Sequence, residues 1–502
     1  MSHLLSWVVF LPLIPIPLLF LLPKDKGKWL ALAVTLADFV IGLPLILGFD
    51  RAMPGVSNPG EMQFVERATW IPSLGVEYYI GIDGLSVTMI LLTLLIGVLA
   101  VLASWNIAKH EAGYWSMFLL LQTAMLGVFV SLDLILFFVF WEVMLFPMYF
   151  LIGIWGGPRR VYAAIKFFLY TLFGGVGMLL AFIAIWYYAP GQRTWDMIEI
   201  LQRVSAGGHF NGPDIFGVEF AKMIFVVLFV GFAIKVPIFP FHTWLPDAHV
   251  EAPTAISVIL AGVLLKMGTY GMLRINFTLF PEAFHWFRTF LVVLAVINIV
   301  YGALCALAQS DLKKMVAYSS VSHMGFILLG MAAATPQGMN GAMLQMFNHG
   351  TITAMLFLLV GVIYDRAHHR QIDGFGGMAS VMPKFAALTS FAFMAAIGLP
   401  GLSGFVSELL ILSGSFKVYQ VATIIAGLGI IFGAGYMLWS YQRVFFGKVN
   451  EKYADFKDVN VIEVASLVPL LVIVVYLGIF PNNLIVFFEQ SMNHISELLL
   501  AR

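Results

Sequence analysis

Long hydrophobic stretches recur along almost the whole chain, separated by short polar segments. An α-helix needs about 20 apolar residues to cross the hydrocarbon core of a bilayer. By this criterion the pattern predicts about fourteen spanning helices, at residues 3–22, 28–49, 84–106, 114–131, 133–155, 164–188, 219–238, 253–275, 286–308, 314–334, 340–365, 384–416, 421–446 and 461–482. We therefore expect an all-α polytopic membrane protein.

Composition supports this fold class and excludes several functions. The chain is 61% hydrophobic and only 11% charged, whereas a soluble domain has about 25% charged residues. A formal net charge of zero argues against nucleic-acid binding. The single cysteine, Cys305, excludes an internal disulfide or a cysteine-bound metal cluster. Because no nucleotide, haem, flavin or iron–sulfur motif is visible, we expect no redox centre and no cofactor in this chain.

Lysine and arginine gather in alternate loops. The loops after the odd-numbered helices hold 15 of these residues, against 8 in the opposite set. Basic residues favour the cytoplasmic side of a membrane. We therefore expect the first set to face the cytoplasm of a bacterial inner membrane, with both termini in the periplasm.

Two predicted helices are broken by proline and glycine next to a charged residue. In the first, at 228–249, Lys235 is followed by Pro237, Pro240 and Pro246. In the second helix, the segment 398–401 (Gly-Leu-Pro-Gly) precedes Glu408. Proline removes a backbone donor and interrupts the helix. Unpaired backbone groups at membrane depth are tolerated only where protein buries them or water reaches them. Both breaks are therefore candidate ion-binding points.

The broken helices are the seventh and twelfth in order, so they enter the membrane from opposite sides. This spacing suggests two inverted repeats, a first of helices 4–8 and a second of helices 9–13. The corresponding domains are 1–113, 114–275, 276–446 and 447–502. The alternative is that glycine and proline are simply frequent in membrane helices.

Several ionisable residues lie within predicted spans, where a charge costs roughly 2.5–3.5 kcal/mol or more. Glu142 lies roughly 14 Å and Lys266 roughly 20 Å along their helices at 1.5 Å per residue. Coupled acids and bases can pass protons, and histidine titrates near neutral pH. The candidates for proton translocation are Glu142, Lys235, Lys266 and Glu408, with Lys166, His323 and His349 as relay or supporting residues. The alternative is static ion pairs that join helices, and Lys166 could also extend to the interface.

Other polar residues within the spans carry weaker signals. Asp83 precedes a predicted helix and is expected to cap it. Asp38 has no evident partner. Prolines separate His242, Asp247 and His249, and no ligand spacing recurs among them. We therefore expect no metal site.

Several segments together resemble the antiporter-like subunits of respiratory complex I, over nearly the whole chain. They include Trp141-Glu142 and the segments at 163–170 (Ala-Ala-Ile-Lys-Phe-Phe-Leu-Tyr), 235–237, 241–249 (Phe-His-Thr-Trp-Leu-Pro-Asp-Ala-His), 252–255, 264–271, 317–325 and 398–405. The resemblance implies fourteen helices with inverted repeats and an amphipathic surface helix near 189–218. It also implies sibling subunits on both sides and a peripheral arm that holds FMN and iron–sulfur clusters and serves NADH and quinone.

The same resemblance implies roles for individual residues. Glu142 and Lys235 are similar to the family's coupled pair, Lys266 to its central relay and Glu408 to its exit site. His323 and His349 resemble its connecting histidines. Glu408 is distinctive, since most siblings and cation/proton antiporter subunits have lysine there.

The expected function is therefore proton translocation by a membrane subunit of an NADH-quinone oxidoreductase. One alternative is a subunit of a cation/proton antiporter or membrane-bound hydrogenase, which shares the same core. Another is a membrane scaffold whose charges only hold helices together.

Overall fold

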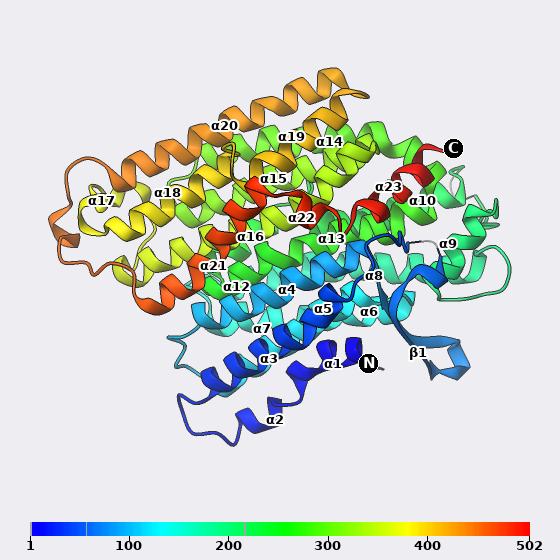
Figure 1. The fold of residues 1–502 in the computed structure, drawn as a ribbon, viewed down its shortest axis with the longest axis horizontal. Helices are drawn as coiled ribbons and strands as arrows, with labels where there is room; N and C mark the ends of the chain where they lie inside the picture. Colours follow the sequence, from blue (N-terminus) through cyan, green and yellow to red (C-terminus); the bar gives the residue numbers. More distant parts are fainter. Residues whose placement is uncertain (1–2, 57, 215–216, 502) are drawn as a thin grey trace.

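The computed structural model describes residues 3–56, 58–214 and 217–501, and it is a bundle of helices that run mostly side by side (Figure 1). Among these residues, 11 helices are long and apolar enough to cross a membrane. They are α3 (Gly27–Leu47), α4 (Gly84–Ala103), α5 (Glu111–Val130), α6–α7 (Leu134–Trp155), α8 (Arg160–Tyr188), α12–η5 (Thr254–Phe277), α14 (Pro281–Leu307), α15 (Leu312–Ala333), α16 (Pro336–Ala367), α20 (Gln420–Phe445) and α21 (Val461–Ile479). The first and last residues, predicted to lie in the periplasm, are outside the described ranges.

Proline divides two of the predicted spans. The first becomes α1 (Leu4–Phe10), a short 3-10 turn, and α2 (Ile16–Leu19), because its prolines interrupt the hydrogen-bond ladder. The helix that carries Glu142 consists of α6 (Leu134–Val143) and α7 (Leu145–Trp155), which meet at Met144. Pro147 lies four residues after Val143 and cannot donate to its carbonyl, which accounts for this interruption.

Both predicted helix breaks are present. Helix α10 (Phe220–Lys235) ends at Lys235, and the chain becomes helical again as α11 (Trp244–Glu251). Helix α18 (Pro383–Ile397) ends at Gly398, whose φ of 81° lies in the left-handed region that favours glycine, and α19 (Ser403–Phe416) follows.

The helix that carries Lys266 is itself irregular. It consists of α12 (Thr254–Ile259), the π-helix η4 (Leu260–Leu264), α13 (Leu265–Gly271) and the π-helix η5 (Met272–Phe277). This helix packs against α4 and α16, and it is buried among them. By contrast, α8, α20 and α21 leave much of their apolar surface exposed. Lys266 therefore lies at the centre of the bundle.

The chain is mostly helical, as predicted, but it also contains one β-hairpin that the all-α prediction did not include. Strands β1 (Gln63–Ile71) and β2 (Val76–Ile82) form an antiparallel hairpin, with Ala68 opposite Tyr78, and the hairpin projects from the side of the bundle (Figure 1). The predicted amphipathic helix near 189–218 is present as α9 (Met197–Ser205), which buries Met197, Ile200 and Leu201. Two unpredicted helices, α22 (Asn482–Ile485) and α23 (Glu489–Leu500), complete the described chain.

Candidate proton-transfer site

Lys235 and Glu142 are neighbours, but they do not form a direct ion pair. The Lys235 ammonium is buried at the end of α10, 3.1 Å from the sulfur of Met144. Glu142 lies within electrostatic reach of it, yet no N···O contact within 4.0 Å joins the two side chains. One buried carboxylate oxygen of Glu142 lacks a hydrogen-bond partner in the described protein. The pair is therefore separated in this structure.

Glycines on α8 make room for the Glu142 carboxylate. A Cβ atom at Gly175 would overlap Oε1 of Glu142. At the neighbouring Gly174, a Cβ would approach the carbonyl oxygen of Gly231 to 3.2 Å. Small residues allow helix backbones to come this close in membranes. Helices α8 and α10 are thus packed tightly around the Glu142 side chain.

Lys266 is fully buried and bonded to a histidine. Its Nζ donates to the backbone carbonyl of Ala261 in η4, and it lies 2.6 Å from Nδ1 of His349 on α16. π-helical turns occur mostly at functional sites, where they displace the regular hydrogen bonds. The backbone of the π-helix η4 therefore provides one of the two hydrogen-bond partners of Lys266.

The row of titratable groups continues from His349 to Glu408. The rings of His349 and His323 have centroids 5.8 Å apart, and Nδ1 of His323 lies 3.1 Å from Oε1 of Glu408. Nε2 of Gln345 also lies 3.5 Å from that oxygen. A cavity of about 10 Å³ lies among these side chains, which is on the order of the space needed for a single water molecule.

Of the seven residues proposed from the sequence, four form this continuous row: Lys266, His349, His323 and Glu408. Glu142 and Lys235 form a separate pair beside it. Lys166 does not join either group, because its Nζ pairs with Asp247 at 2.7 Å and donates to the Thr243 carbonyl at 2.9 Å. Lys166 therefore connects α8 to the start of α11.

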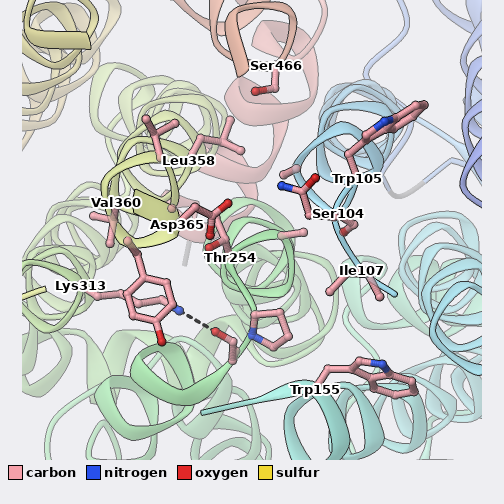
Figure 2. Close-up of a pocket in the computed structure, with 18 of the residues that line it drawn as sticks. Ser104, Trp105, Ile107, Trp155, Thr254, Lys313, Leu358, Val360, Asp365 and Ser466 are labelled. Carbon is pink, nitrogen blue, oxygen red and sulfur yellow. Dashed lines mark hydrogen bonds between the residues drawn. The ribbon is translucent and has the colours of Figure 1, made fainter. Parts of the chain in front are cut away.

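A larger cavity of about 350 Å³ lies among the loops predicted to be cytoplasmic. Figure 2 shows Lys313 and Asp365 on one side of it, with Trp105, Ile107 and Trp155 on the other. Nζ of Lys313 donates to the Ala252 carbonyl at 2.6 Å. This cavity has room for several water molecules, since one water molecule needs about 10–15 Å³ of such space.

The sequence did not identify His249 as part of a proton path. The side chain is fully buried on Phe357 with a ring separation of 4.5 Å, and neither ring nitrogen has a partner in the described protein. It lies within electrostatic reach of both Lys266 and Lys313. In the sequence it stood out only within the motif at 241–249 and, with His242 and Asp247, as a metal ligand that the spacing did not support. In the described ranges, no group of three or more His, Cys, Asp or Glu is arranged to hold a metal ion.

A family model described as "NADH:quinone oxidoreductase/Mrp antiporter, TM" matches residues 131–433. The chain is also 43% identical to NADH-quinone oxidoreductase subunit M of Rhodobacter capsulatus, over 99% of this chain and 97% of that protein. The chain belongs to the NADH:quinone oxidoreductase/Mrp antiporter family. A second model, for the amino terminus of NADH-ubiquinone oxidoreductase chain 4, matches residues 62–133.

Solved structures of this family share the fold. A chain of respiratory complex I from Thermus thermophilus superposes with a TM-score of 0.87 at 30% identity, covering 99% of both chains. A chain of the Mrp complex from Dietzia superposes with a TM-score of 0.80 at 25% identity, covering 97% of this chain and 51% of that one. The architecture is therefore that of a multi-pass membrane subunit of such assemblies.

Two acids of this family member have structural partners. Asp83 caps α4 through Leu85 and Ser86, as predicted, and it also forms a buried 2.5 Å ion pair with Arg274. Asp38 accepts a 2.6 Å hydrogen bond from Gln122. Arg274 falls inside the predicted span 253–275, and the structure buries it in η5. The ion pair between Asp83 and Arg274 joins helices that are distant in the sequence, so the sequence could not reveal it.

The arrangement can perform acid–base chemistry along one line. Amines, imidazoles and carboxylates each exchange protons, and the small cavity lined by the histidines and Glu408 is on the order of the space that one water molecule needs. The described side chains of the row contain no thiolate or other redox group. Proton transfer is therefore the chemistry this row can support.

Proposed function

We propose that this chain translocates protons as a membrane-arm subunit of an NADH-quinone oxidoreductase, the counterpart of the relatives named subunit M. The observation that carries the proposal is the row from Lys266 through His349 and His323 to Glu408. Partner subunits supply the FMN, the iron–sulfur clusters and the sites for NADH and quinone. Sibling antiporter-like subunits lie on both sides, against the exposed apolar helices.

In this proposal each part of the row has one task. Water in the cavity near Lys313 delivers protons toward Lys266, with His249 between them. Lys266 passes protons through His349 and His323 to Glu408, which lies beside the break between α18 and α19 and releases them on the far side. Glu142 and Lys235 change the charge near this path as they pair and separate, and Lys166 supports α11.

A scaffold alone accounts poorly for these contacts. A charge buried at the bilayer centre costs roughly 2.5–3.5 kcal/mol or more, so a scaffold is expected to pair its charges directly. Glu142 and Lys235 are apart, and buried nitrogens of His249, His323 and His349 have no partner in the described protein. Buried polar atoms without a fixed hydrogen-bond partner suit groups that exchange partners and protons.

The same proposal includes the membrane topology. The 11 long helices, together with three broken or short crossings at α1–α2, α10–α11 and α18–α19, give fourteen crossings. The breaks after α10 and α18 support two inverted repeats, with domains 1–113, 114–275, 276–446 and 447–502. The basic loops support a cytoplasmic position for the large cavity, in a bacterial inner membrane with periplasmic termini.

A cation/proton antiporter subunit is the second candidate, favoured by the TM-score of 0.80 with the Mrp complex chain. The match of residues 62–133 to the chain 4 model favours the oxidoreductase instead.

Purification of the tagged chain from its own membranes distinguishes the two candidate functions. We expect NADH-oxidising subunits to co-purify and NADH to drive acidification in vesicles. Sodium/proton exchange without NADH, with no such subunits bound, would support the antiporter.

A further inference from the structure

Three residues outside the proposed proton path surround the Lys235 ammonium. The sulfur of Met144 lies 3.1 Å from Nζ, and the ring centroids of Trp141 and Phe167 lie 5.5 Å and 5.4 Å from it. A thioether sulfur is a weak hydrogen-bond acceptor, and the faces of aromatic rings attract cations. These three side chains form a cage suited to an ammonium group.

The cage is notable because a stronger partner is close by. Glu142 lies within electrostatic reach, but its carboxylate faces Gly175 and one of its oxygens has no hydrogen-bond partner in the described protein. A buried ammonium separated from its carboxylate needs other attractive contacts. The sulfur and the two rings provide them.

The position of Met144 follows from the interrupted helix. It is the residue at which α6 ends and α7 begins, and Pro147 is responsible for that interruption. The interruption lets the side chain at position 144, two residues after Glu142, reach Lys235 on α10. The same break thus positions two alternative partners for one lysine.

We propose that Met144, Trp141 and Phe167 form a second holding site for the Lys235 ammonium, which alternates between this cage and the Glu142 carboxylate. The inference rests on the proposed function, because it assigns the alternation a role in proton transfer. Met144 is a positioning residue that acts through Lys235. While the ammonium is in the cage, Glu142 lacks a direct cation and accepts a proton; when the ammonium returns, the proton leaves.

Other charged groups around Lys235 are already held. Lys166, on the neighbouring α8, is paired with Asp247. Lys266, on the adjacent α13, is held by Ala261 and His349. Glu142 and Lys235 lie within electrostatic reach of each other. A change at Met144 is therefore expected to act on the Glu142–Lys235 pair.

The test replaces the sulfur with carbon at nearly constant volume, using Met144→Leu in the complete enzyme complex. Met148→Leu is the matched control, since it makes the same change at a buried position one turn further along α7. We measure NADH-driven proton pumping in membrane vesicles as a function of pH. Without the sulfur, Lys235 stays longer at Glu142, and a nearby cation favours the ionised carboxylate.

We expect Met144→Leu to move the alkaline limb of the pH profile toward lower pH by on the order of one unit, with several-fold slower pumping on that limb. Phe167→Leu, which removes one ring of the cage, should move it in the same direction. Met148→Leu should retain the wild-type profile. A profile for Met144→Leu equal to that of the control, or a loss of assembled complex without any shift in profile, would overturn the proposal.

Glu142→Gln, measured on the same membranes, separates this inference from the proposed function. If Glu142→Gln abolishes pumping and Met144→Leu behaves as its control, the cage is wrong and the proton path stands. If the assembled Glu142→Gln complex pumps as wild type, the role proposed for the pair is wrong, and the cage proposal fails with it.

Discussion

Glu142 is the carboxylate whose surroundings leave it most free to change partner. It lies next to Lys235 without contacting it, and one oxygen is buried without a hydrogen bond in the described protein. Replacing it by glutamine keeps the shape and removes the exchangeable charge. We expect Glu142→Gln to assemble but to lose proton pumping by at least ~10-fold, while Glu142→Asp retains much of it. Pumping in vesicles and assembly on native gels are the measurements; a fully active Gln variant would refute the assignment.

Gly175 offers a test of the same carboxylate from the opposite helix. A methyl group there would overlap Oε1 of Glu142, so Gly175→Ala should displace the carboxylate and impair pumping. Gly177→Ala is the control two residues along α8, because its Cβ would meet only Val227 at 3.6 Å. Equal pumping by the two assembled variants would show that the position of Glu142 does not depend on this contact.

At the scale of single residues, the sequence revealed which side chains are chemically unusual but not which of them meet. Charge within an apolar stretch identified Glu142, Lys235, Lys266 and Glu408, because burial of a charge is costly wherever the helix lies. The contacts of Gln345 with Glu408 and of Met144 with Lys235 cross between helices distant in sequence. Glutamine and methionine within a helix carry no comparable signal, so these residues were missed.

The helix break at Gly398 belongs to the scale of elements, and it predicts the behaviour of Glu408. The break places Glu408 at the end of the row, where His323 and Gln345 contact it. We expect Glu408→Ala to impair pumping strongly. Glu408→Lys should not restore it fully, because a second cation then faces His323 and Lys266. NADH oxidation and proton pumping, measured on membranes with equal amounts of complex, check both variants; wild-type pumping by Glu408→Ala would exclude the exit role.

The ion pair between Asp83 and Arg274 joins two elements, the start of α4 and the π-helix after Lys266. Both side chains are almost fully buried. Loss of one partner of a buried pair costs about 3–5 kcal/mol, so Asp83→Ala should lower the thermal stability of the complex. Glu451→Ala changes an exposed acid and should leave stability unchanged. Retention of intact complex during a temperature ramp is the measurement, and equal stability of the two variants would contradict this role.

Elements with a strong hydrophobic signal were predictable, and those without it were not. The long apolar stretches predicted the membrane helices, and proline with glycine predicted the two breaks. The hairpin was missed because β1 exposes consecutive residues from Arg67 to Trp70 and lacks the alternating burial of a core strand. The π-helical turns beside Lys266 also escaped prediction, because they depend on packing against neighbouring helices.

At the scale of the whole molecule, we propose that the chain is one insulated acid–base path within a larger enzyme. The central helix with Lys266 is buried between α4 and α16, and the row leads from it to the break before α19. The exposed apolar faces of α8, α20 and α21 are left for lipid or sibling subunits. In the proposed function, proton exchange is confined to this buried interior, and electron transfer belongs to partner subunits.

The most direct test of this account is proton pumping by a complex in which Lys266 is replaced by methionine. Lys222→Met is the matched control, since Lys222 pairs with Glu219 near the start of α10 and lies outside the row. We expect both complexes to assemble, Lys222→Met to pump as wild type, and Lys266→Met to pump at least ~10-fold more slowly during NADH oxidation. Wild-type pumping by the assembled Lys266→Met complex would contradict the account.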